Sequence, residues 1–383
     1  MIKKFTTSSF VYAGSALLFS IGRQIVFLPI LHKIAPTLFQ EISFLLVLVD
    51  FLVYSMGASI SDYYVKKVTL NDKKLELYKF LFYFSFLSLF SVFIFLFYQF
   101  SLLASVLIAI YLLFYIFNTL QMKLFFNDMQ FSKNYFYIMM RLIPYALLLI
   151  YCSLTEFPSL IYFIISLILS ETIAFYTLRK QLDLTYNNIS VSSNFIKKKE
   201  LIYFIVTYLL ISLVMRLDML VIEYNFTSKF TEYYQMISIY MIFINPIILL
   251  SSGSLLSILT KVEYKDFLRY KYKILFIIIT VSIISGLFFQ FFGQYIINLL
   301  YPDNSLINSY TYLSFLVIFT TLSFQMLKTF IIKYNSVKKL FFYNTIIIIV
   351  SIIFIFNFIY FIVSFYLFRL FIYLFQYMKL EKE

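Results

Sequence analysis

The sequence is poor in the residues on which most enzyme and metal sites depend. Its 383 residues include one cysteine, Cys152, one histidine, His32, and no tryptophan. A single cysteine excludes a disulfide within the chain, and one histidine with one cysteine makes a His/Cys metal site or a catalytic triad implausible. Six glycines leave no room for a dinucleotide fingerprint, and no P-loop motif is present. We therefore expect no cofactor, no metal ion and no enzymatic activity.

Charge is also scarce, and long apolar runs take its place. Charged residues make up 13% of the chain and hydrophobic residues 62%, with a mean hydropathy of +0.91. Apolar runs of about 18 residues or more are typical of membrane-spanning helices. The pattern predicts about twelve spans, near residues 8–31, 40–60, 78–98, 100–122, 134–154, 157–178, 201–222, 233–259, 274–299, 306–327, 340–357 and 359–378.

The basic residues outside these spans fall almost entirely on one side of the predicted bundle. Of 31 Lys and Arg residues, only Lys33 and Lys229 lie in segments predicted to face outward. The positive-inside rule then predicts that both termini are cytoplasmic. The net charge of +13 is explained by basic loops facing anionic membrane lipid rather than nucleic acid.

The longest polar stretch, residues 179–200, follows six predicted spans and precedes six. We interpret it as a cytoplasmic linker between an N-terminal six-helix lobe, 1–190, and a C-terminal six-helix lobe, 191–383. Both lobes begin on the same side of the membrane, as in parallel transporter repeats. The outward loops are short, which disfavours a polymerase or ligase that works on sugars outside the membrane.

Several ionisable residues lie deep within predicted spans. An isolated charge at the centre of a membrane helix costs about 2.5–3.5 kcal/mol on insertion scales, so each needs a partner or a function. These residues are the arginines Arg23, Arg141, Arg216 and Arg369 and the acids Asp50, Glu171 and Asp218.

Polar residues share helix faces with these charges, and Pro144 predicts a kink beside Arg141. A polar stripe facing lipid is not viable, so we expect the stripes to line a water-filled cavity. Its predicted polar lining includes Tyr54, Ser212, Asn245 and Gln325.

Two interpretations of the buried charges follow. Either each arginine pairs with an acid and fixes the bundle, or Arg23, Arg141, Arg216 and Arg369 converge on a cationic cavity for an anionic substrate. Guanidinium groups suit phosphate because they bind it through two donors and stay charged. Asp218, opposite Arg216 on its helix, is expected to pack against a neighbouring helix. Glu171 is either a buried protonated acid or an ion-coupling group.

Two stretches resemble a known family. Residues 8–53, SSFVYAGSALLFSIGRQIVFLPILHKIAPTLFQEISFLLVLVDFLV, are similar to the start of Wzx-type polysaccharide flippases, which belong to the multidrug/oligosaccharidyl-lipid/polysaccharide (MOP) exporter superfamily. Residues 216–250, RLDMLVIEYNFTSKFTEYYQMISIYMIFINPIILL, are similar to the opening of that family's second half.

The resemblance implies an all-α integral membrane protein with two pseudo-symmetric six-helix lobes that alternate between inward- and outward-open states. It implies transport of an undecaprenyl-pyrophosphate-linked oligosaccharide repeat unit from the inner to the outer leaflet of the bacterial cytoplasmic (inner) membrane. Arg23 matches a lumenal arginine position of the family. Asp50 and Glu171 are candidate ion-coupling residues, and the polysaccharide polymerase and chain-length proteins are candidate partners. The alternatives are another MOP-type exporter, or a membrane-embedded polysaccharide polymerase or ligase.

Overall fold

The chain folds into helices throughout the part that the structure describes. The structure, a computed structural model, describes residues 14, 17–53, 55, 88–127, 135–155, 159–186, 198–249, 264–302, 311–334 and 337–380. Helices occur in or beside every predicted span. In chain order they are η1 (Gly22–Phe27), α2 (Leu28–Ile34), α3 (Pro36–Leu52), a short apolar helix at Ser88–Phe97, α6 (Leu102–Asn127), α7 (Tyr135–Met140), α8 (Ile143–Leu154), α9 (Leu160–Tyr186), α10 (Lys198–Asn225), α11 (Thr227–Leu249), α13 (Tyr264–Leu300), α15 (Thr311–Tyr334), α16 (Val337–Ile353) and α17 (Phe358–Met378).

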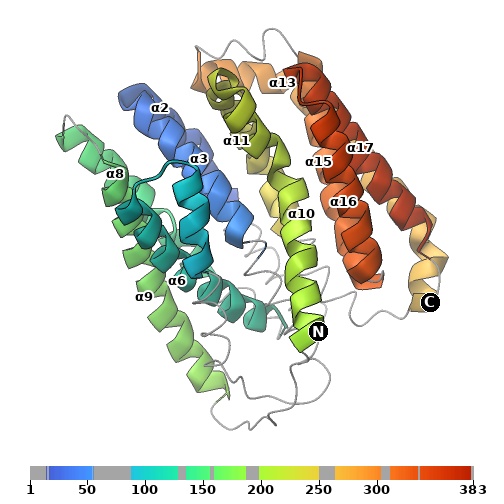
Figure 1. Ribbon diagram of the computed structural model, residues 1–383, viewed down its shortest axis with the longest axis horizontal. Helices are drawn as coiled ribbons and strands as arrows, with labels where there is room; N and C mark the ends of the chain where they lie inside the picture. The colour runs from blue at the N-terminus through green and yellow to red at the C-terminus, as the bar shows by residue number, and fades with distance from the viewer. Residues whose placement is uncertain are drawn as a thin grey trace. The chain divides into compact units, whose positions relative to one another are not determined.

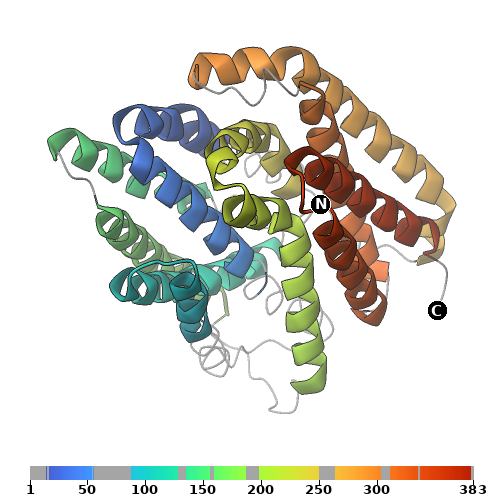
Figure 2. The ribbon, with the colours of Figure 1, turned by 45° about the horizontal axis from the view of Figure 1, so that its top comes forward.

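Many of these helices can cross a bilayer. Within the described residues, eight helices are long and apolar enough to do so. Helix α13 has 37 residues, which correspond to about 55 Å along its axis, well beyond the roughly 30 Å of a bilayer core. In Figure 2 its C-terminal part runs in a different direction from its N-terminal part. Its side chains Phe276, Phe291 and Tyr295 are exposed, as lipid-facing groups would be.

The chain packs as two units. Unit 1 comprises Met1–Ser15 and Ile30–Ser212, and unit 2 comprises Ala16–Pro29 and Leu213–Glu383. In unit 1, α9 packs against α3, α6, α7 and α8. In unit 2, α15 packs against α13, α11 and α17, and α16 lies beside α17 (Figure 1). The prediction of lobes at 1–190 and 191–383 stays a prediction.

The last two predicted spans are separate helices joined by a tight turn. Backbone turns at Phe354 and Ile355 end α16. The side chain of Asn357 then caps α17 by accepting from the backbone N–H groups of Ile359, at 2.9 Å, and Tyr360, at 3.3 Å. The sequence indicated a turn at Asn357, and the structure confirms it.

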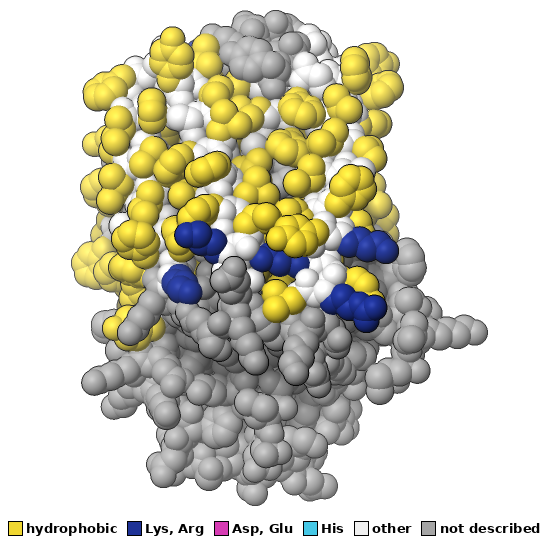
Figure 3. Space-filling view, turned by 90° about the vertical axis from the view of Figure 1, so that its right-hand side faces the viewer, with side chains coloured by type: hydrophobic (Ala, Val, Ile, Leu, Met, Phe, Trp, Pro, Cys, Tyr) yellow, Lys and Arg dark blue, Asp and Glu magenta, His cyan; other side chains and the backbone are white. Residues whose placement is uncertain are grey.

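Basic side chains gather at one end of unit 2. The ammonium of Lys271 near the start of α13 donates to the carbonyls of Met378 (2.5 Å) and Leu380 (3.2 Å), which places that start beside the end of α17. Figure 3 shows one face of the molecule, with hydrophobic side chains above a band of Lys and Arg side chains; no described Asp or Glu is visible on this face. Among the described side chains, the exposed basic residues at this end are Arg269, Lys273, Lys339 and Lys379.

Candidate functional site

The predicted kink at Pro144 is a complete break between two helices of unit 1. Helix α7 ends at Met140, Arg141 and Leu142 form a turn, and α8 begins at Ile143. Proline has no N–H, so Pro144 cannot donate to the carbonyl of Met140 four residues earlier. The hydroxyl of Ser170 on α9 donates to that carbonyl instead, at 3.0 Å. The break therefore has a defined geometry, fixed from α9.

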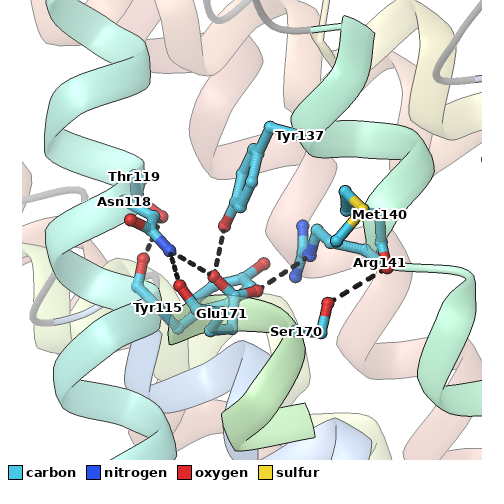
Figure 4. Close-up of polar contacts among 8 residues, drawn as sticks. All are labelled: Tyr115, Asn118, Thr119, Tyr137, Met140, Arg141, Ser170 and Glu171. Atoms are coloured by element: carbon cyan, nitrogen blue, oxygen red, sulfur yellow. Dashed lines mark hydrogen bonds and ion pairs between the residues drawn. The ribbon is translucent and has the colours of Figure 1, made fainter. Parts of the chain in front are cut away.

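Next to Ser170, Glu171 lies at the centre of a polar cluster. Its Oε2 accepts from the amide of Asn118 on α6 at 2.7 Å and from the hydroxyl of Tyr137 on α7 at 2.9 Å. Its Oε1 lies 3.4 Å from Nε of Arg141. Figure 4 shows these groups converging on the carboxylate from three sides. We call Tyr115, Asn118, Tyr137, Arg141 and Glu171 the Glu171 cluster.

Arg141 covers the carboxylate from the outer side. Its guanidinium carbon lies 4.1 Å from the ring centroid of Tyr115 and 5.6 Å from that of Tyr137. The Arg141 side chain is 27% exposed, whereas the Glu171 side chain is 2% exposed. A guanidinium over an aromatic face is stabilised by about 0.5–1 kcal/mol at an exposed site and by about 2 kcal/mol when it is desolvated. The rings thus help hold the arginine against the acid.

Unit 2 contains a second buried carboxylate with a different arrangement. Oδ2 of Asp218 on α10 accepts from the hydroxyls of Tyr233 on α11 (2.8 Å) and Tyr366 on α17 (2.6 Å). The two hydroxyl oxygens lie 2.9 Å apart. Asp218 thus binds neighbouring helices, as the sequence led us to expect. We call Asp218, Tyr233 and Tyr366 the Asp218 cluster.

Arg369 lies on the other side of Tyr366 and is enclosed by aromatic rings. Its guanidinium carbon is 4.5–4.9 Å from the ring centroids of Phe324, Phe365 and Tyr366. Its Nη2 donates to the hydroxyl of Thr321 at 3.0 Å. Among the described residues, no carboxylate forms an ion pair with Arg369, and its side chain is among the largest fully buried ones.

The polar stripes of α15 and α17 face the interior of unit 2, as polar stripes on apolar helices must. Thr321 and Gln325 on α15 and Arg369 and Gln376 on α17 are all buried. Gln325 accepts from the ammonium of Lys328 at 2.6 Å. The predicted span ended at residue 327, so Lys328 was expected just outside it on the cytoplasmic side. In the structure α15 continues to Tyr334, and Lys328 is buried, with 2% of its surface exposed.

The other predicted site residues lie in different surroundings. Arg23, in η1 of unit 2, is half-buried, and its guanidinium carbon lies 6.0 Å from the ring centroid of Phe19. Arg216 on α10 and Asp50 on α3 are also half-buried. Of the other predicted lining residues, Ser212 is buried and donates to the carbonyl of Phe51 at 2.5 Å. The side chains of Tyr54 and Asn245 lie outside the part of the chain that the structure describes.

The structure therefore brings Arg23, Arg216 and Arg369 into unit 2 and Arg141 into unit 1. Sequence reasoning did not identify Asn118 or Tyr115 as neighbours of Glu171, because they lie on a different span and no local spacing links them. A signal was present for Tyr137, which lies four residues before Arg141 and shares its helix face. In the described part of the chain, no cluster of three or more His, Cys, Asp or Glu residues could hold a metal ion.

Comparison by sequence finds no matching protein-family model and no matching curated protein. Comparison by structure finds close folds. A MATE transporter crystallised with MaD5 aligns with a TM-score of 0.70 at 10% identity, over 98% of this chain and 93% of that one. A multidrug-resistance MATE transporter of the MOP superfamily, in an outward-facing conformation, aligns with a TM-score of 0.63 at 10% identity, over 99% and 95% of the two chains.

A third similar structure is a MOP-superfamily transporter from Pyrococcus furiosus, described as having a binding pocket of reversed polarity that suggests a different function. It aligns with a TM-score of 0.55 at 10% identity, over 99% of this chain and 95% of that one. The chain is thus an all-helical, multi-pass membrane protein with the fold of MATE transporters of the MOP superfamily, over nearly its whole length.

Proposed function

We propose that the protein is a MOP-type flippase. In this proposal it moves an undecaprenyl-pyrophosphate-linked oligosaccharide from the inner to the outer leaflet of the bacterial cytoplasmic membrane by alternating access. The observation that carries the proposal is the likeness to MATE-fold transporters over 98% of the chain, in a sequence whose spans carry arginines. The resemblance of the first two spans to Wzx-type flippases supports the choice of substrate.

The charges in the spans favour an anionic head group over a cationic drug. Arg23 and Arg216 are half-buried side chains within apolar helices. A guanidinium binds phosphate through two charge-assisted hydrogen bonds and repels a cationic solute. The similar archaeal transporter with a pocket of reversed polarity illustrates that this fold accepts more than one pocket chemistry.

The four proposed substrate contacts, Arg23, Arg141, Arg216 and Arg369, differ in their present surroundings. Arg141 contacts Glu171, and Arg369 is enclosed by rings. These two would reach a transported pyrophosphate only after a rearrangement of their units. We therefore place the first contact with the pyrophosphate at Arg23 and Arg216, and we keep Asp50 and Glu171 as the candidates for ion coupling.

The proposal is tested by replacing the arginines in a strain whose surface glycan depends on the protein. Arg23→Ala and Arg216→Ala should each abolish surface glycan while the protein stays in the membrane, and Lys at either position should restore it only in part. Arg269→Ala, which removes an exposed cation at the end of unit 2, is the matched control and should keep activity. Full activity in both Arg23→Ala and Arg216→Ala would overturn the cationic-cavity proposal.

A sugar-transfer assay addresses the alternatives. A polymerase or ligase would join sugar units in purified form, whereas a flippase would only move the lipid-linked unit between leaflets. Measured glycosyl transfer by the purified protein would replace the flippase proposal. Export of a drug or of another anionic lipid without movement of the lipid-linked oligosaccharide would assign it to another branch of MOP-type exporters.

A further inference from the structure

Two oppositely charged side chains of unit 2 each leave one buried polar atom unused. The side chains of Asp218 and Arg369 are both buried, with 4% and 2% of their surfaces exposed. Among the described residues, neither Oδ1 of Asp218 nor Nε of Arg369 has a hydrogen-bond partner. A buried donor or acceptor without a partner costs free energy, and the cost is larger for a charged group. The two unused atoms are complementary, because the oxygen accepts and the nitrogen donates.

The acid and the guanidinium lie against the same part of α10. Nη1 of Arg369 donates to the carbonyl of Val214 at 3.5 Å. In an α-helix this carbonyl points toward the N–H of the residue four positions later, which is that of Asp218. Side chains also tilt toward the N-terminus of their helix, so the carboxylate of Asp218 leans toward the turn that the guanidinium contacts. The two charges are therefore about one helical turn apart.

The ring of Tyr366 contacts both charges. Its hydroxyl donates to Oδ2 of Asp218 at 2.6 Å, and its ring centroid lies 4.6 Å from the guanidinium carbon of Arg369. Tyr366 precedes Arg369 by three residues on α17, so the two side chains share one face of that helix. No ion pair joins Asp218 to Arg369 in the described part of the chain. Tyr366 thus separates two groups that would otherwise attract each other.

Aromatic groups satisfy each charge only in part. The faces of Phe324 and Phe365, with centroids 4.5 and 4.9 Å from the guanidinium carbon, attract the cation but offer no hydrogen-bond acceptor to its Nε. The tyrosine hydroxyls reach only one oxygen of Asp218. A direct contact between carboxylate and guanidinium would use both remaining atoms in charge-assisted hydrogen bonds.

We propose that Asp218 and Arg369 are a latent ion pair, held apart by the ring of Tyr366, that forms when this ring is displaced. The guanidinium then has two positions. In this structure the rings of α15 and α17 hold it, and in the paired arrangement the carboxylate of α10 holds it. Tyr366 is the positioning residue that selects between them. This inference goes beyond the proposed function and stands whether or not the protein is a flippase.

The test compares the cost of one substitution, Asp218→Asn, in different backgrounds. The measurement is the midpoint of thermal unfolding of the full-length protein in detergent at neutral pH. In wild type, Asp218→Asn should lower the midpoint by less than about 2 °C, because no ion pair is lost. In a Tyr366→Ala background it should lower the midpoint by at least about 4 °C, because a buried ion pair is broken.

Two further backgrounds make the result specific. Tyr366→Phe removes the hydroxyl but keeps the ring, so Asp218→Asn should cost as little there as in wild type. Tyr366→Ala combined with Arg369→Gln removes the cation, so the large cost of Asp218→Asn should disappear. If Tyr366→Ala cannot be purified, Tyr366→Leu opens the same space with less loss of packing and serves the same comparison.

Three outcomes would overturn the proposal. The first is a cost of Asp218→Asn in the Tyr366→Ala background that is no larger than in wild type, or a gain in stability there, as expected for removal of an uncompensated buried charge. The second is a large cost that persists with Arg369→Gln. The third is an equally large cost in the Tyr366→Phe background. Transport is not measured, so failure of the latent pair and failure of the proposed function are distinguishable.

Discussion

At the scale of single residues, the two buried acids show how surroundings decide the role of a charge. Glu171 has a cation 3.4 Å away, whereas Asp218 has two tyrosine hydroxyls and no described cation within ion-pair distance. Oδ1 of Asp218 is buried without a hydrogen-bond partner. The structural role of Asp218 is therefore to join α10, α11 and α17 through hydrogen bonds to Oδ2.

This role predicts unequal effects for two substitutions of Asp218. Asp218→Asn keeps an acceptor oxygen for Tyr233 and Tyr366 and should lower the free energy of unfolding only slightly. Asp218→Leu leaves the two hydroxyls only each other as partners, so one of them loses its acceptor, and it should cost about 1–3 kcal/mol. Thermal unfolding in detergent measures the difference, and equal losses would contradict the role of Oδ2. Asp218→Leu in a Tyr233→Phe/Tyr366→Phe background should recover much of the loss.

The sequence predicted which charged residues lie within the membrane spans, but it did not predict which side chains contact them. Composition and hydropathy were enough to place Arg141, Glu171 and Arg369 inside predicted spans, because charges within apolar runs are visible directly; in the structure Glu171 and Arg369 lie in helices and Arg141 in the turn between two. Their partners could not be predicted, because Asn118 precedes Glu171 by more than fifty residues and only tertiary packing brings them together. The aromatic enclosure of Arg369 was equally hidden, since phenylalanine and tyrosine are abundant along the whole chain.

At the scale of elements, the break between α7 and α8 combines a predictable and an unpredictable part. Pro144 alone predicted the interruption, because proline removes an intrahelical hydrogen bond. The compensating hydroxyl of Ser170 comes from another helix and could not be inferred from spacing. The extension of α15 past Lys328 was missed because hydropathy marks the end of an apolar run, not the end of a helix.

A double-mutant cycle tests the coupling between Pro144 and Ser170. Ser170→Ala should lower the free energy of unfolding by about 1 kcal/mol, because the carbonyl of Met140 loses its donor. In a Pro144→Ala background the restored N–H of residue 144 can bond to that carbonyl, so Ser170→Ala should cost clearly less. Additive effects in thermal unfolding would show that the two residues are independent. Ser166→Ala, which removes a hydroxyl of the same helix that bonds to Phe163, is the matched control.

At the scale of the whole molecule, the multi-pass helical architecture was predictable because the bilayer imposes a length and a composition on each span. The likeness to MATE-fold structures confirms the fold class, although only 10% of residues are identical. The distribution of basic residues also predicts how the protein is oriented in the membrane, with its basic end toward the cytoplasm. Lys229 lies at the start of α11, whereas Lys339 and Lys379 lie at the basic end of unit 2.

The predicted orientation is testable with single cysteines. Because Cys152 is the sole cysteine, Cys152→Ala gives a thiol-free background. In intact cells, a membrane-impermeant maleimide should label Lys229→Cys, which replaces an exposed residue. It should label Lys339→Cys and Lys379→Cys only after the membrane is permeabilised. Labelling of the latter pair in intact cells would reverse the assignment of the cytoplasmic side.

The contact between Lys271 and the end of α17 has a consequence for motion within unit 2. The ammonium is buried and donates to two carbonyls at that end, while the hydroxyl of Tyr377 donates back to the carbonyl of Lys271 at 3.0 Å. Unwinding the last turn of α17 would strand a desolvated ammonium, so fraying there is penalised. The start of α13 and the end of α17 should consequently stay together in any transport cycle.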